Sequence, residues 1–74
     1  MITSTSSASD IQRFLTIENF EADILLTFKK YNGRAILGIS NENIKKICGD
    51  SEGERLIGIL NYIKNTQIGG NLIF

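Results

Sequence analysis

Two groups of carboxylates and one cysteine are the side chains of this sequence that could do chemistry. The carboxylates are Glu18, Glu21, Asp23, Asp50, Glu52 and Glu54, and the cysteine is Cys48. Neighbouring carboxylates can act as general acid and base, and a thiol can act as a nucleophile beside a base. The chain has no histidine, which is the commonest general base and metal ligand. The carboxylates and the cysteine therefore lack the histidine partner that catalysis usually requires.

The positions of these groups favour structural roles. Both carboxylate groups fall where predicted helices begin, and acidic residues are stabilised there by the helix dipole. Cys48 shares helical spacing with Ile44 and Ile47, which predicts a buried thiol. The glycines match no Walker or dinucleotide-binding fingerprint. We therefore expect no enzymatic activity, no cofactor and no metal site.

Length and composition describe one small globular domain. The chain has 74 residues, of which 42% are hydrophobic, with eight basic and eight acidic residues. This balance provides no overall charge to attract nucleic acid or an anionic membrane. No apolar run reaches the roughly 18 residues of a membrane-spanning helix. A single cysteine excludes an internal disulfide and favours an intracellular location.

Apolar residues recur at intervals of three and four and proline is absent, so we predict an all-α fold of five mostly short helices. Ser9 or Asp10 would cap the first helix. A second helix would carry Phe20 and Phe28 in phase. It would stop at Asn32-Gly33, because glycine tolerates the positive φ of many helix C-caps.

Three further helices are predicted in the second half of the chain. A short one of one or two turns comes first. Ser40 would cap the next, which Gly49 would end. Asp50 or Ser51 would cap the last and longest helix, which should end near Asn65.

The helical domain is predicted over residues 10–65, after a flexible, Ser/Thr-rich lead-in over residues 1–9 and before a tail over residues 66–74. Two interpretations of the tail stay open, the start of a strand and part of a neighbouring domain. The core residues share helical phase in each segment. They are Phe14, Leu15, Phe20, Ile24, Phe28, Leu37, Ile44, Ile47, Leu56, Ile59, Leu60 and Ile63.

One series of short motifs is more specific than this periodicity. It consists of Phe14-Leu15, Asn32-Gly33 followed by Arg34-Ala35-Ile36-Leu37, Ile39-Ser40, Ile44, Ile47-Cys48-Gly49, Gly53-x-Arg55-Leu56 and Leu60. The series resembles a sterile alpha motif (SAM) domain over Asp10 to about Asn65. Such a resemblance implies a five-helix bundle that binds proteins, commonly other SAM domains.

The Cys48-Gly49 pair and the Gly53-x-Arg55-Leu56 motif are similar to one branch of that family, the SAM domains of late-SV40-factor and grainyhead-related transcription factors. The SAM-like domain of the EGF-receptor-pathway substrate family of actin regulators has a comparable run. A parent protein in transcription regulation or signalling is the expectation from this likeness. The location would be nuclear in the first case and otherwise cytoplasmic.

Within the family, a mid-loop surface of one copy commonly docks on the start of the fifth helix of the next. We name the corresponding residues here the basic surface, Lys29, Lys30, Arg34, Lys45 and Lys46, and the helix-start surface, Asp50, Ser51, Glu52, Gly53, Glu54 and Ile57. Their opposite charges would guide association. RNA binding, as in some SAM domains, is the alternative, although the acidic residues of the helix-start surface would repel phosphate.

Overall fold

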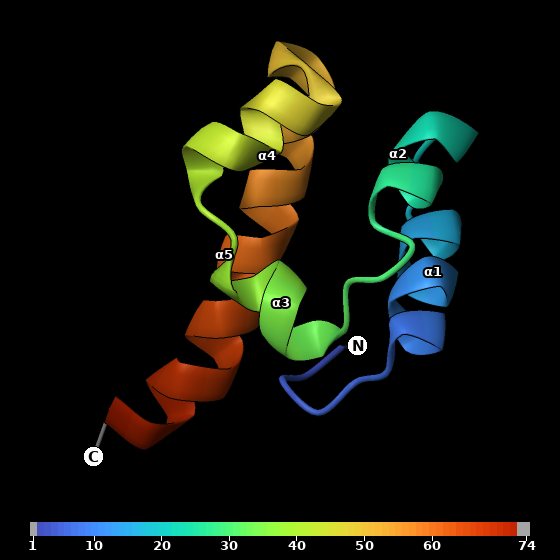
Figure 1. Ribbon diagram of the computed structural model, residues 1–74. Helices are drawn as coiled ribbons and strands as arrows, with labels where there is room; N and C mark the ends of the chain where they lie inside the picture. The colour runs from blue at the N-terminus through green and yellow to red at the C-terminus, as the bar shows by residue number, and fades with distance from the viewer. Residues whose placement is uncertain (1, 73–74) are drawn as a thin grey trace.

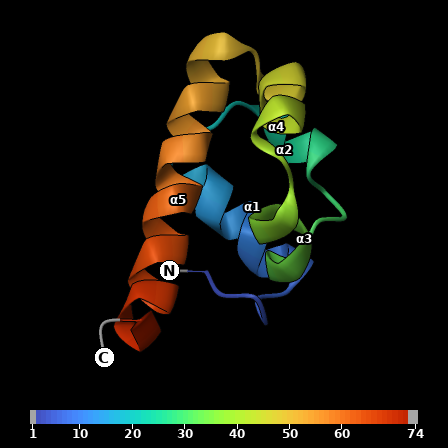
Figure 2. The ribbon, with the colours of Figure 1, turned by 90° about the vertical axis from the view of Figure 1, so that its left-hand side faces the viewer.

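Five helices form a small bundle in the computed structural model, which describes the backbone of residues 2–72 and the side chains of residues 2–66 (Figure 1). The prediction of an all-α fold is confirmed, since no strand occurs in the described residues. The helices are α1 (Ala8–Ile17), α2 (Ala22–Thr27), α3 (Gly33–Gly38), α4 (Asn41–Cys48) and α5 (Asp50–Leu72). Seen at right angles to the first view, α5 runs along one side of the molecule and the shorter helices lie on the other (Figure 2).

Helix α1 begins two or three residues earlier than the sequence predicted. Ser7, and not Ser9 or Asp10, is the N-cap, and its hydroxyl accepts a hydrogen bond from the Asp10 amide at 3.1 Å. The Asp10 carboxylate accepts in return from the Ser7 amide at 3.1 Å. This reciprocal capping box satisfies two amides that the helix leaves unpaired. Asp10 is therefore the N3 residue of the capping box and not the N-cap.

The segment before α1, which the sequence predicted as a flexible lead-in, contacts the helices. Ile2 is 4% exposed and belongs to the core. The Gly33 amide donates a hydrogen bond to the carbonyl oxygen of Ser6 at 2.8 Å, and a Cβ on Gly33 would overlap the carbonyl oxygen of Thr3. Close backbone packing therefore requires glycine at the start of α3.

This packing corrects the predicted role of Asn32-Gly33. Helix α2 ends at Thr27, so the pair does not terminate it. Asn32 is instead the N-cap of α3, and its side chain accepts a hydrogen bond from the Ala35 amide at 2.9 Å. Among the described glycines, only Gly49 has a positive φ.

The predicted limits of α4 are confirmed. The Ser40 hydroxyl accepts a hydrogen bond from the Asn43 amide at 3.2 Å, and Gly49 ends the helix with φ of 85°. Helix α5 follows after that single residue and continues to Leu72, beyond the end predicted near Asn65. The tail is thus helical as far as it is described, not the start of a strand, and Figure 1 shows these turns projecting beyond the other helices. Residues 73 and 74 lie outside the described residues.

The core lies where α5 faces the shorter helices. Eight predicted core residues are buried: Leu15, Phe20, Ile24, Phe28, Ile44, Leu56, Leu60 and Ile63. Ile36 is buried and Leu37 only partly so, which reverses the prediction for α3. Tyr31 packs edge-on against Phe28, with ring centroids 4.9 Å apart. Within the described part of the chain, no helix has the length and apolar character needed to cross a membrane.

Candidate interaction surfaces

The start of α5 lies directly against the end of α4. Gly49 turns the chain between them, and its amide donates to the carbonyl oxygen of Lys45 at 2.8 Å. Gly53 is buried, and a Cβ there would lie 3.0 Å from the Cα and 3.2 Å from the Cγ of Lys45. Gly53 therefore packs inside the domain, against α4.

Lys45 and Glu54 connect the two predicted surfaces within one molecule. The Lys45 ammonium lies 3.7 Å from the Glu54 carboxylate, and the side chains are 45% and 70% exposed. An exposed pair of this kind contributes little to stability, because water screens both charges. Its position shows that the basic surface and the helix-start surface adjoin at the contact between α4 and α5.

The other residues of the basic surface are exposed and carry unpaired charges among the described residues. Lys29 and Lys30 follow α2, Arg34 lies in the first turn of α3, and Lys46 lies in the last turn of α4. These elements meet around the core, but no ion pair or hydrogen bond unites the four side chains in one site. The basic surface is therefore a spread of separate charges.

The helix-start surface differs from the prediction at two residues, the buried Gly53 and the partly buried Ile57. Asp50 and Ser51 are exposed, as expected for a surface at the end of a helix. Ile57, which was predicted to be exposed, is partly buried and packs against the core. It follows that Ile57 supplies less apolar surface to a partner than its sequence position indicated.

Arg55 joins the start of α5 to the turn between α1 and α2. Its guanidinium donates to both carboxylate oxygens of Glu52, at 3.2 and 2.9 Å, and to the carbonyl oxygen of Glu18 at 2.7 Å. The same group lies over the Phe20 ring, 4.0 Å from its centroid, a cation–π arrangement. The Gly53-x-Arg55-Leu56 motif gave no indication of these contacts across the bundle.

The pKa values of this pair follow from the geometry. Hydrogen bonding from Arg55, aided by its charge, lowers the pKa of Glu52 below its ordinary value. The same hydrogen bonds raise the pKa of Arg55. Glu52 is therefore a charged and already partnered carboxylate, whereas Asp50 keeps its charge free of ion pairs among the described residues.

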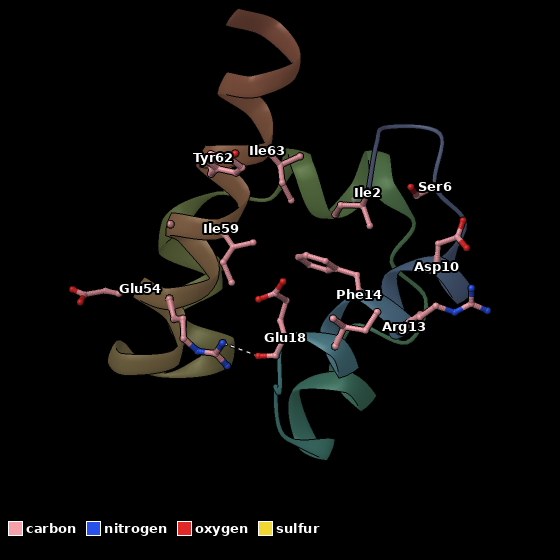
Figure 3. Close-up of a pocket in the computed structure, with 13 residues that line it drawn as sticks. Ile2, Ser6, Asp10, Arg13, Phe14, Glu18, Glu54, Ile59, Tyr62 and Ile63 are labelled. Carbon is pink, nitrogen blue, oxygen red and sulfur yellow. Dashed lines mark hydrogen bonds between the residues drawn. The ribbon is translucent and has the colours of Figure 1, made fainter.

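A groove of about 950 Å³ opens between α1 and α5, and Glu54 of the helix-start surface lines one edge of it (Figure 3). Phe14 from α1 and Ile59 from α5 face each other across it. Ile17 and Tyr62 also line the groove, and they are 68% and 63% exposed. Glu18 lies near the centre of the view, and its carboxylate points toward the space between Ile59 and Phe14. Sequence reasoning missed this site.

A comparison with protein-family models matches residues 1–61 to the SAM domain (sterile alpha motif) family. The chain belongs to this family. Curated proteins and solved structures gave no match to the chain. The match covers α1 to α4 and the first half of α5, and so includes the segment before α1 that packs on Gly33. SAM domains are generally protein–protein interaction modules and not enzymes.

The one cysteine of this SAM domain has the environment of a packing residue. Cys48 is partly buried against the core, and this burial, followed by the charge of Glu52, raises the pKa of its thiol. A raised pKa keeps the thiol protonated at neutral pH, and the thiolate is the nucleophilic form. No cluster of three potential metal-ligating side chains was found in the described part of the chain.

Proposed function

We propose that this SAM domain is the oligomerisation module of a larger protein, in which it joins SAM domains of its own kind or of another protein head to tail. The observation that carries the proposal is the opposite charge of its exposed residues at two places. Arg34 and Lys46 carry free positive charge, and Asp50 carries free negative charge at the start of α5. Complementary charges of this kind guide encounter and fix register.

Only the unpaired residues of each surface are available to a partner. Glu52 is engaged by Arg55, and Glu54 is shared with Lys45. Asp50 and Ser51 therefore form the accessible part of the helix-start surface. A contact between two different surfaces is heterologous, so it propagates into an open chain unless the rotation between copies closes a ring.

The parent protein is proposed from the motif resemblance alone. The Cys48-Gly49 pair and the Gly53-x-Arg55-Leu56 motif support a branch of transcription factors, with actin regulators of the EGF-receptor pathway as the second relative. The first would place the chain in the nucleus and the second in the cytoplasm. In either case the SAM domain would bring together copies or partners of the protein that carries it.

Paired charge reversals test the head-to-tail contact. We expect the Asp50→Lys/Ser51→Lys variant and the Arg34→Glu/Lys46→Glu variant each to be monomeric by light scattering at concentrations where the wild type has a higher mass. Each variant keeps one intact surface. Mixing them should therefore restore a one-to-one dimer that cannot extend, and added salt should weaken it over a screening length of about 8–10 Å.

A matched variant separates the contact from general charge effects. Glu21→Lys also replaces an exposed carboxylate at the start of a helix, where the side chain makes no capping hydrogen bond, but it lies on α2. It should associate like the wild type. Failure of the two complementary variants to pair, while the wild type associates, would place the interface elsewhere on the domain.

A further inference from the structure

Three large apolar side chains are mostly exposed among the described residues. Two of them line one groove, and the third lies on a different helix. Ile17 and Tyr62 line the groove between α1 and α5, on opposite walls. Leu26 projects from α2 and is 69% exposed. Apolar side chains gathered in a groove are typical of sites that bind another molecule, whereas a single projecting side chain is typical of a group that fills one.

The groove combines an apolar lining with charged residues that are negative in sum. The carboxylates that line it are Asp10, Glu18 and Glu54, and the positive charges are Arg13 and Arg55. The charge of Glu18 also attracts Arg55. Phe14 and Ile59 supply its inner walls. The Glu18 carboxylate points into it and makes no hydrogen bond or ion pair within the described structure, although the Glu18 carbonyl oxygen accepts from Arg55. An occupant that fits this site has an apolar side chain with a positive charge close beside it.

Helix α2 and the turn after it provide such a group. Lys29 and Lys30 follow Leu26 in the turn directly after α2, which ends at Thr27, so their charges lie near the Leu26 side chain along the chain. The Lys29 amide donates to the carbonyl oxygen of Leu26 at 3.2 Å, which continues the turn. Both lysines are exposed and form no ion pair among the described residues. Leu26, Lys29 and Lys30 are named the α2 knob below.

We propose that the groove of one copy binds the α2 knob of a second copy, with Leu26 packed between Ile17 and Tyr62 and a lysine facing Glu18. The occupant is a second copy because its exposed apolar and basic groups complement the two features of the groove. This contact rests on the proposed function in assuming that copies of the SAM domain associate. It shares Lys29 and Lys30 with the basic surface and Glu54 with the helix-start surface, but it does not use Asp50, Ser51, Arg34 or Lys46, the residues reversed in the head-to-tail test.

Uncharged substitutions test the contact without altering the charged surfaces. We expect Ile17→Ser and Leu26→Ser each to raise the dissociation constant of self-association about tenfold, as hot-spot side chains do, when it is measured by sedimentation equilibrium. Ala35→Ser is the matched control, because Ala35 is also exposed on a short helix. All three variants should keep the thermal stability of the wild type, since the replaced side chains are outside the buried core.

A cross-link locates the contact directly. In a Cys48→Ser background, Leu26→Cys mixed with Tyr62→Cys should form an intermolecular disulfide under mild oxidation. Leu26→Cys mixed with Ala35→Cys should not. Equal cross-linking in both mixtures would overturn the proposal, since it would mean collision without a defined contact.

The outcomes separate this contact from the head-to-tail function. Association lost in Ile17→Ser and Leu26→Ser but kept in the charge-reversal variants would support the groove and overturn the head-to-tail contact. The opposite pattern would overturn the groove and leave the proposed function standing. A wild type that stays monomeric at several hundred micromolar in low salt would overturn the second copy as occupant, and head-to-tail joining would then require a different SAM domain.

Discussion

Two glycines of α5 offer a direct measure of how tightly this helix packs on α4. Gly53 is buried against Lys45, whereas a Cβ on Gly58 would have no neighbouring atom within 4 Å. Alanine at either position adds one methyl group to the same helix. We therefore expect Gly53→Ala and Gly58→Ala to change the free energy of unfolding in different ways.

The magnitudes follow from two competing effects. Replacing glycine by alanine inside a helix stabilises it by about 0.5–1 kcal/mol, because the unfolded chain loses freedom. Gly58→Ala should show this gain alone. At Gly53 the new methyl would lie 3.0 Å from the Cα of Lys45, so α4 has to move, and overpacking of this kind costs about 1–3 kcal/mol. The net effect of Gly53→Ala should be a loss of about 0–2.5 kcal/mol.

Chemical and thermal unfolding of the two variants measure the difference. For a domain of this size, 1 kcal/mol shifts the melting temperature by about 4–8 °C, so the two alanine variants should be resolved easily. The difference between them cancels the shared helix-propensity term and leaves the cost of packing. Equal stabilisation by both substitutions would refute the account of Gly53 as a packing residue and return it to the candidates for partner contact.

Three further predictions concern the core, the ion pair and nucleic acid. Leu60→Ala should cost about 2–5 kcal/mol in denaturant unfolding, because Leu60 is 1% exposed in the core, and a loss below about 0.5 kcal/mol would mean that its packing is wrongly described. The pKa of Glu52 is lowered by Arg55, so the ion pair stabilises the fold above the unfolded pKa of about 4.3 and is lost as the pH falls through the folded value. The stability lost in Glu52→Gln at neutral pH should vanish in strong acid, and a pH-independent difference would contradict this origin. Fluorescence anisotropy with a stem-loop RNA and a duplex DNA should show no tight binding, since acidic and basic residues are equal in number, and submicromolar, sequence-selective affinity would refute this prediction.

Local signals in the sequence were sufficient for the helices and most of the core. Ser40 and Gly49 mark the ends of α4 because a side-chain cap and a positive φ are properties of single residues. Leu56, Leu60 and Ile63 were identified because one face of a long helix repeats at a fixed spacing. In the six residues of α3 the same rule had too little length to distinguish Ile36 from Leu37.

Packing between distant segments explains what the sequence did not reveal. Gly33 was wrongly predicted to end a helix, because no local pattern indicates that it packs against Thr3 and Ser6 near the N-terminus. The groove was missed for the same reason, since Ile17 and Tyr62 are 45 positions apart, the difference between their residue numbers, and become one surface only in the bundle. The exposure of Leu26 likewise depends on how α2 is turned.

Arg55 relates this long-range packing to the candidate surfaces. Its guanidinium holds the turn that begins at Glu18, at the groove, and pairs with Glu52, at the start of α5. Both candidate surfaces therefore lie on backbone that one side chain fixes in place. A rigid site loses less conformational entropy when it binds, so Arg55 favours association at either surface, although it also lines the groove itself. Replacing Arg55 should consequently weaken both contacts together, whereas substitutions at Asp50 or Ile17 should weaken one.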